Sequence, residues 1–317
     1  MTRERVRLGT RRSALAVAQA RSVATALTAA TGVEAELVEI TTAGDVSAAP
    51  LAQIGGTGVF VNALRDALHE NRIDLAVHSL KDLPTGSAAG LVVAAVPERE
   101  DPRDVLCARY GLTIGELPTG ARIGTGAPRR IAQLLALGLG LDVVPIRGNV
   151  DTRLARVADG SLDGVVLARA GLARLGRLAE ATEVLDPLLM LPAPGQGALA
   201  VECRAGGDVA DLVAVLDDPT TRSAVTAERS LLAALEAGCT APIGAYAEVA
   251  EGEDDLELYL RAVAVSPDGA VSIRKSATGP LTSAEALGRD LAAQLLDDGA
   301  GRLVGVHTRA LEEETVP

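Results

Sequence analysis

The chain has 317 residues, of which 48% are hydrophobic and 23% charged, a composition typical of a globular protein with two or three domains. Its net charge of −12 and its few aromatic side chains (one Phe, three Tyr and no Trp) argue against the basic, stacking surface that nucleic acid requires. No export signal or membrane-length apolar stretch is visible, and the three cysteines lie far apart without a CxxC pair. We therefore expect a cytoplasmic protein with no membrane partner, no disulfide framework and no metal site.

The first predicted unit alternates strands with helices. A short strand at 6–10 precedes an Ala-rich helix that begins after Ser13, a suitable N-cap residue, and ends before Gly32. Further strands are predicted at 33–40, 73–78 and 91–96, and a helix is predicted at 59–69. This alternation predicts a largely parallel sheet.

The pattern restarts after the Pro-containing segment 97–102. Strands are predicted at 121–124, 143–147 and 164–168, and helices at 128–137 and 152–158. A second Pro-rich connector at 191–197 leads to a strand at 198–202. If the chain crosses back there to complete the first sheet, the two units face each other over a two-strand hinge and a cleft.

A third unit follows from Pro219. A helix is predicted at 219–236, strands at 243–249, 256–265 and 271–277, and a second helix at 284–296. The alternation of Leu256, Leu258 and Leu260 indicates an antiparallel sheet with one covered face. The predicted domains are residues 1–97 with 198–216, residues 103–191, and residues 219–317.

Arginine recurs at strand-to-helix turns. Arg11 and Ser13 follow the first strand, the pair Arg129 and Arg130 opens a helix, and Arg147 to Arg153 surround a third turn. A surface charge is the alternative reading of any one arginine, but the recurrence favours a cleft that binds carboxylates or phosphates. The glycines of these turns do not form a dinucleotide-binding fingerprint.

A candidate acid or base follows the apolar strand that starts at Ile73. The run from His78 to Pro84 contains Lys81 and Asp82. An aspartate at a cleft-facing strand end can stabilise a developing cation and transfer a proton. The alternative is that Asp82 only bonds the backbone of its own turn.

Cys239 lies between a predicted helix and a predicted strand, with Gly238 before it and Pro242 shortly after. The context is consistent with a covalent attachment site, but an inert cysteine that fills space below a turn is the commoner role of an unpaired cysteine. His78 is a conceivable base for a Cys–His hydrolase, but no third orienting group is recognisable near the cysteine.

Taken together, these motifs resemble porphobilinogen deaminase, also called hydroxymethylbilane synthase. The resemblance runs from about residue 6 to the late 200s, and it rests on the following segments in one order: 7–13, 77–84, Arg129-Arg130, 147–149, 192–197 and 238–244. It implies two α/β domains like those of periplasmic binding proteins, joined by a two-strand hinge, and a C-terminal α+β domain with a three-stranded antiparallel sheet.

The resemblance also implies an activity. The enzymes of this family condense four porphobilinogen molecules head to tail, release ammonia at each step, and finally release 1-hydroxymethylbilane in tetrapyrrole biosynthesis. Cys239 matches the cysteine that carries the dipyrromethane cofactor through a thioether, and Asp82 matches the catalytic aspartate. The implied protein is a monomeric transferase whose partner is porphobilinogen.

Other residues match positions that bind the acetate and propionate side chains of the cofactor or the substrate. The resemblance implies cofactor contacts for Ser13, Lys81, Asp82, Thr125, Arg129, Arg130, Arg147 and Gly148, and substrate contacts for Arg11, Phe60, Arg147, Arg153, Arg174 and Gln196. Packing against the sheet is an equally good reading of Phe60.

Two segments depart from the family pattern. Thr57 stands where the family often has Lys, and Gly126 and Ala127 replace two serines. We expect somewhat weaker anchoring of the cofactor near 126 and 127 without loss of activity. The charged arginine contacts, at about 1.5–3 kcal/mol each, contribute more than the two lost hydroxyls.

Two rival functions remain at this level. A non-catalytic anion-binding protein related to solute-binding proteins explains the arginines but not Cys239. A Cys–His amidohydrolase uses the thiol but leaves the arginines and Asp82 without roles.

Overall fold

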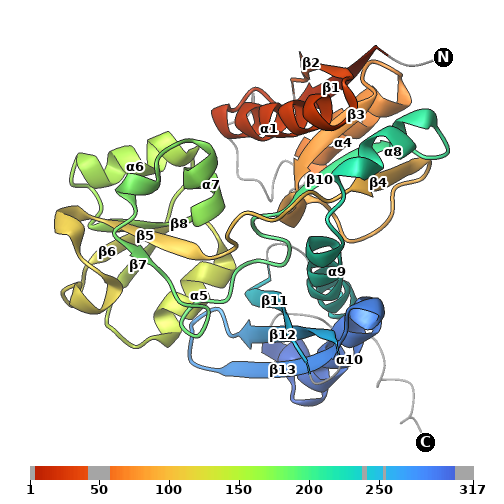
Figure 1. Ribbon diagram of the computed structural model, residues 1–317. Helices are drawn as coiled ribbons and strands as arrows, with labels where there is room; N and C mark the ends of the chain where they lie inside the picture. Colours follow the sequence, from red (N-terminus) through yellow and green to blue (C-terminus); the bar gives the residue numbers. More distant parts are fainter. Residues whose placement is uncertain (1–3, 42–57, 238–240, 253–254, 304–317) are drawn as a thin grey trace, which may run out of the picture.

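The computed structural model describes residues 4–41, 58–237, 241–252 and 255–303 and consists of three bodies (Figure 1). Two are α/β lobes on five-stranded sheets, and the third is a three-stranded antiparallel sheet with helices on one face. The predicted fold class is thus confirmed. Among the described residues, no helix is long and apolar enough to cross a membrane.

The first lobe is built on a sheet of order β2-β1-β3-β10-β4. Its strands are β1 (Arg5–Thr10), β2 (Glu34–Glu39), β3 (Leu75–Ser79), β4 (Leu91–Ala95) and β10 (Leu199–Arg204), and its helices are α1 (Ala14–Thr31), α4 (Gly58–His69) and α8 (Asp208–Val213). Helices α1 and α8 pack on one face around Leu8, Leu27 and Val213, while α4 packs on the other around Leu64 and Ile73.

Helix α1 begins and ends where its capping residues predict. The Ser13 hydroxyl accepts a hydrogen bond from the Ala16 N–H at 3.3 Å, which satisfies one of the unpaired donors of the first turn. Gly32 adopts the left-handed conformation (φ 74°) that closes a helix and donates its N–H to the Thr28 carbonyl.

The second lobe has the sheet order β7-β6-β8-β5-β9. Its strands are β5 (Asp104–Ala108), β6 (Arg122–Thr125), β7 (Asp142–Pro145), β8 (Gly164–Ala168) and β9 (Glu183–Val184), and its helices are α5 (Pro128–Ala136), α6 (Val150–Ala158) and α7 (Arg169–Arg174). Strands β5 and β9 were not predicted from the sequence.

The prediction of a largely parallel sheet is confirmed: in each lobe four of the five strands run in one direction, and one strand runs in the opposite direction. β10 runs antiparallel to β3 and β4, and β5 runs antiparallel to β8 and β9. Both strands directly follow a connection between the lobes: the first connection, residues 96–103, precedes β5, and the second, residues 185–198, precedes β10. The chain therefore enters each sheet from the opposite lobe and in the opposite direction.

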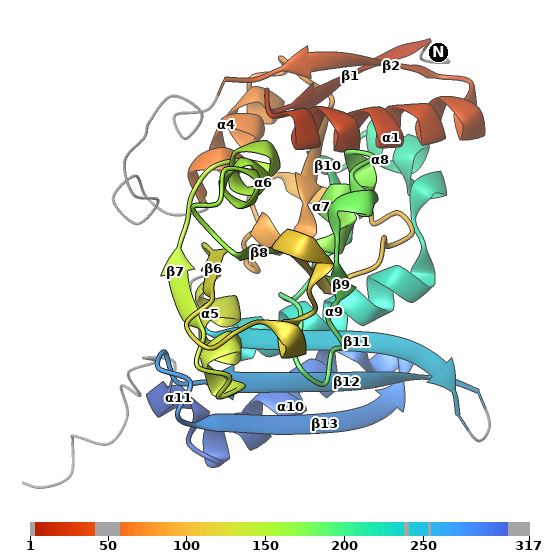
Figure 2. The ribbon, with the colours of Figure 1, turned by 90° about the vertical axis from the view of Figure 1, so that its left-hand side faces the viewer.

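The C-terminal body consists of β11 (Ile243–Glu251), β12 (Leu256–Val265) and β13 (Ser272–Pro280) with α9 (Pro219–Ala234), α10 (Ala284–Asp297) and α11 (Ala300–Leu303). Leu231 of α9 and Leu291 of α10 pack against Leu258 and Leu260 of the sheet. Figure 2 shows the three strands in front of these helices and below the two lobes.

One buried carboxylate joins the C-terminal body to both connections between the lobes. Glu228 of α9 is 0% exposed. It accepts hydrogen bonds from Arg99 Nη1 (2.7 Å) and Nη2 (3.0 Å) in the first connection, and from the Gly195 N–H (2.6 Å) in the second. The Ala247 N–H of β11 donates a fourth, at 2.8 Å. The Glu228 charge is thus buried with its hydrogen bonds made, as burial of an ion requires.

Gly197, in the second connection, offers a test of how closely the two connections pack. Its φ is 90°, and a Cβ there would collide with the carbonyl oxygen of Glu100. Gly206 has a similar φ of 73°, but a Cβ at that position would have nothing within 4 Å, so it is the matched control. Gly206→Ala should cost about 1–2 kcal/mol, the penalty for a left-handed residue. Gly197→Ala should cost about 1–3 kcal/mol more in denaturant unfolding, because the backbone must also move. Equal losses in the two variants would contradict this packing.

Candidate active site

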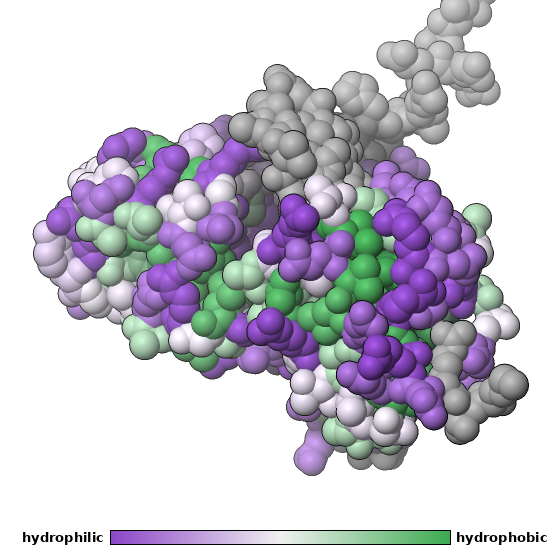
Figure 3. All heavy atoms as spheres, turned by 90° about the horizontal axis from the view of Figure 1, so that it is seen from above, coloured by the Kyte–Doolittle hydropathy of each residue, from purple (hydrophilic) through white to green (hydrophobic). Residues whose placement is uncertain are grey.

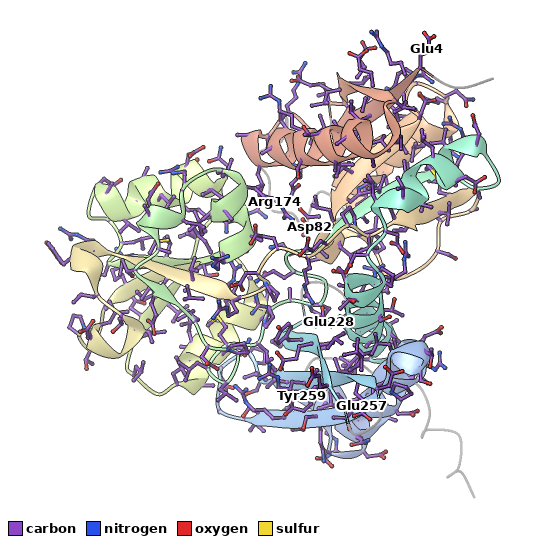
Figure 4. All side chains as sticks on the ribbon, in the orientation of Figure 1. Glu4, Asp82, Arg174, Glu228, Glu257 and Tyr259 are labelled. Atoms are coloured by element: carbon purple, nitrogen blue, oxygen red, sulfur yellow. The ribbon has the colours of Figure 1, made fainter. Side chains whose placement is uncertain are left out.

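The predicted site residues come from the carboxyl ends of strands in both lobes. Lys81 and Asp82 follow β3 in the first lobe, while Thr125 ends β6 and Arg147 follows β7 in the second. Figure 4 places Asp82 and Arg174 in the region between the lobes, and Figure 3 shows a recess between them from above. The topology thus brings residues far apart in sequence to one cleft.

Asp82 lies on a short 3-10 turn, Leu80–Asp82, directly after β3. Leu80 and Leu83 are buried on either side of it, and Asp82 itself is exposed. Within the described residues its carboxylate makes no ion pair or hydrogen bond. The turn therefore presents one available carboxylate on a fixed base.

The arginine pair at the start of α5 is bound by a buried carboxylate, Asp104 of β5. Arg129 Nη2 donates to Asp104 Oδ2 at 2.8 Å, and Arg130 Nη2 donates to Oδ1 at 2.9 Å. The side-chain amide of Gln196 adds a third hydrogen bond to Oδ1, at 2.7 Å. Burial alone would raise the pKa of Asp104, but the two adjacent arginines hold it well below its usual range.

Lys81 lies at the edge of this network. Its Nζ donates to Gln196 Oε1 at 3.3 Å. Burial lowers the pKa of Lys81 to about 8, with Asp82 opposing the shift and Arg130 adding to it. An anion brought next to Lys81 would reverse this shift.

Two more arginines of the second lobe are partly desolvated. Arg153 of α6 donates from Nε to the Gly148 carbonyl at 2.9 Å, and burial together with Arg130 lowers its pKa to about 10. Arg174, at the end of α7, donates to the Gly197 carbonyl at 2.6 Å, and burial lowers its pKa as well. No carboxylate of the described residues pairs with either guanidinium.

The remaining predicted residues occupy positions of different kinds. Thr125 is fully buried, Arg11 is half-buried and Arg147 is exposed. Gly148 has a φ of 109°, and a Cβ there would lie 2.8 Å from the Thr152 side chain, so this turn requires glycine.

His78 is engaged away from the cleft. It is 5% exposed, and its Nε2 lies 3.1 Å from Oε2 of buried Glu202. Arg65 donates to the same carboxylate from Nε and Nη2. This buried triad gives His78 a structural role and leaves it poorly placed to act as a hydrolase base.

Two predicted residues lie outside what can be described. Cys239 falls between the described segments, after α9 and before β11 in the sequence. The backbone of Phe60 belongs to α4, but its side chain is not among those described. Thr57 also lies outside the described residues.

Sequence reasoning missed Asp104, Glu228 and Arg229. The signal for Asp104 was weak because it opens a strand of only five residues after a proline. Glu228 and Arg229 lie in a helix whose pattern predicts only an amphipathic element. Their partners come from distant segments, which no local pattern indicates.

Comparison with known proteins identifies the family. Residues 6–211 match the model described as porphobilinogen deaminase, dipyromethane cofactor binding domain, and residues 223–297 match the porphobilinogen deaminase C-terminal domain. The chain belongs to the porphobilinogen deaminase family. Enzymes of this family are transferases that carry a dipyrromethane cofactor.

Curated relatives agree over nearly the full length. Porphobilinogen deaminase 1 of Streptomyces coelicolor is 59% identical, covering 96% of this chain and 99% of its own. The porphobilinogen deaminase of Nocardia farcinica is 58% identical, covering 94% and 88%. Among solved structures, a putative methionine-binding lipoprotein of Bacillus subtilis is 14% identical with a TM-score of 0.42, covering 69% of this chain and 92% of its own.

The residues of the cleft fit the porphobilinogen deaminase cofactor, whose pyrroles carry acetate and propionate groups. Lys81, Arg129 and Arg130 lie around one buried anion, Asp104, and Arg153 lies near Arg130. The Nε of Arg130 is buried without a hydrogen-bond partner among the described residues. Carboxylates of a bound cofactor would add negative charge to this group of cations.

The departures at 126 and 127 give opposite predictions for two serine substitutions. A Cβ on Gly126 would lie 2.5 Å from the Ile146 carbonyl oxygen, so Gly126→Ser should destabilise the fold by about 1–3 kcal/mol. Ala127 is the N-cap of α5 and makes no side-chain cap bond, so Ala127→Ser should stabilise by about 1 kcal/mol. Denaturant unfolding measures both, and a stabilising Gly126→Ser would contradict the geometry. Neither substitution should raise activity abruptly.

Proposed function

We propose that this chain condenses four porphobilinogen molecules head to tail onto a dipyrromethane primer held by Cys239, with release of ammonia and finally of 1-hydroxymethylbilane. We place this transferase in the cytoplasm as a monomer. The family membership supports the reaction, and the residues of the cleft support the roles assigned below.

One observation carries the proposal: among the described residues, the exposed carboxylate of Asp82 stands beside a group of cations that outnumber the carboxylates paired with them. Asp104 binds Arg129 and Arg130, but Lys81 and Arg153 have no carboxylate partner among the described residues. Burial lowers the pKa values of Lys81 and Arg153, which would not happen to side chains fully exposed to solvent.

The cations bind the acetate and propionate groups in this proposal. The residues assigned to these groups are Arg11, Ser13, Lys81, Thr125, Arg129, Arg130, Arg147, Gly148, Arg153, Arg174 and Gln196, and Phe60 is assigned to the substrate ring. Guanidinium groups suit this task because each can donate two parallel hydrogen bonds to one carboxylate. When bound, the dipyrromethane group supplies the pyrrole to which each new unit is joined.

Asp82 is assigned the chemical step. Its carboxylate accepts hydrogen bonds from pyrrole N–H groups and stabilises the positive charge that develops on porphobilinogen as ammonia leaves. The turn that carries Asp82 is held on both sides by buried leucines, so its backbone is already in place before substrate arrives.

The two rival functions are less well supported. A solute-binding protein needs no thiol and no exposed aspartate in a fixed turn. A Cys–His amidohydrolase needs a base, and His78 is held by Glu202 in the core of the first lobe.

Intact-protein mass spectrometry tests the attachment. Protein made in cells with normal haem synthesis should carry the added mass of a dipyrrole, and Cys239→Ser should not. Cys203→Ser is the matched control, because Cys203 is buried in the first lobe and should leave the adduct in place. An unmodified mass for the unsubstituted chain would overturn the proposal.

A pH titration tests whether the cofactor carboxylates lie next to Lys81 and balance its positive charge. The pKa of Lys81 lies near 10.5 in the unfolded chain and near 8 in the folded one. Because the pKa of Lys81 is lower in the folded chain, protonated Lys81 destabilises the fold below about pH 8. Between about pH 8 and 10.5 the unfolded state binds more protons than the folded state, so the free energy of unfolding rises with pH and the destabilisation disappears. In a Cys239→Ser background, Lys81→Met should therefore be stabilising near pH 7, and its advantage should shrink over that window.

The loaded chain provides the contrast for the same titration. Cofactor carboxylates beside Lys81 raise its pKa, so Lys81→Met should lose its stabilising effect there. Urea unfolding at several pH values measures both series. A stability difference that stays constant from pH 7 to 10.5 in the Cys239→Ser background would contradict the assignment.

A further inference from the structure

The turn that carries Asp82 is held by a residue of the C-terminal body. Arg229 of α9 donates from Nη1 to the Leu83 carbonyl at 2.7 Å and to the Leu80 carbonyl at 3.3 Å. Its Nη2 donates to the Pro84 carbonyl at 2.7 Å. One guanidinium thus binds carbonyls on both sides of Asp82.

Arg229 makes these bonds at a partly desolvated position. Its side chain is half-buried, burial lowers its pKa, and no carboxylate of the described residues pairs with it. Val225, one turn earlier on α9, packs in the same apolar cluster as Leu80 and Leu83. Helix α9 therefore contacts the turn through an apolar and a polar group at once.

The first lobe holds the turn mainly at its start. The Leu80 N–H donates to the Ala198 carbonyl at 3.0 Å, and the Leu83 N–H donates back to Leu80. Pro84 has no N–H, so its carbonyl is its only main-chain hydrogen-bonding group. A cavity of about 500 Å³, lined by Leu80, Thr85 and Arg229 among others, adjoins this contact. The turn thus has room to shift if the guanidinium is removed.

We propose that Arg229 is a positioning residue for the reaction: it fixes the Asp82 turn from the C-terminal body. The inference rests on the proposed catalytic role of Asp82. Since α9 continues in sequence toward Cys239, one helix would then hold the catalytic turn and lead into the segment that anchors the primer.

The test compares kcat and KM of the cofactor-loaded enzyme. Arg229→Lys keeps the charge but loses the planar fork that reaches three carbonyls. Arg222→Lys is the matched control, because Arg222 also lies on α9 and donates to first-lobe carbonyls, at Val93 (3.4 Å) and Ala94 (3.3 Å), away from the turn. Arg229→Lys should lower kcat about 10- to 100-fold with KM and adduct mass unchanged, since small displacements of a reacting group cost this much. Arg222→Lys should leave kcat within about twofold.

A double substitution decides whether Arg229 acts through Asp82. Asp82→Asn alone should lower kcat about 10²- to 10⁴-fold. Adding Arg229→Lys to it should then change single-turnover consumption of porphobilinogen by less than about twofold, because coupled residues are not additive.

Each result has one reading. Unchanged kcat in Arg229→Lys, an equal fall in Arg222→Lys, or full additivity with Asp82→Asn would overturn the positioning role. Full activity of Asp82→Asn would instead overturn the proposed function. If Arg229→Lys does not fold, Arg229→Gln, which keeps two N–H donors without the charge, replaces it in the same comparisons.

Discussion

The structure depends on one buried carboxylate. Glu228 receives four hydrogen bonds from three separate segments: the two connections between the lobes and the first strand of the C-terminal sheet. A buried ion that loses one partner is costly, typically by several kcal/mol, so the three segments are stable together and not in pairs. Glu228 thus links both connections to the C-terminal body, and the contacts of Arg229 and Val225 with the Asp82 turn add to this link.

The cleft between the lobes differs from the surroundings of Glu228, because its cations are only partly paired with carboxylates of the described residues. Asp104 neutralises part of the charge of Arg129 and Arg130, while Lys81 and Arg153 are desolvated and form no ion pair among the described residues. This arrangement is unfavourable for the protein alone and favourable once several carboxylates enter. In the proposed function, an acidic chain with a net charge of −12 thereby keeps a local site for anionic pyrroles.

Much of the fold follows from local signals in the sequence. Ser13 and Gly32 marked both ends of α1, because capping signals act within a few residues. Leu258 and Leu260 of β12 marked the covered face of its sheet, whereas Leu256, at the start of the strand, is exposed. Strand β5 was missed since it is short and follows a proline, and its antiparallel direction depends on the path between lobes.

The candidate site likewise contains some residues that the sequence indicates and others that it does not. Its exposed or cleft-facing residues, such as Asp82 and Arg153, stand in recognisable turn motifs. The residues that hold them do not. Asp104 and Arg229 act through contacts with segments 25 to 149 positions away, and only the folded chain brings those partners together.

The strand order of the first sheet has a consequence for biosynthesis of the chain. β10 (199–204) pairs between β3 and β4, so the first sheet lacks an inner strand until the second lobe has been synthesised. All five strands of the second sheet lie within 104–184 and emerge from the ribosome earlier. The second lobe can close first, while one edge of β3 lacks its partner, and is open to aggregation, until residues 199–204 have left the ribosome.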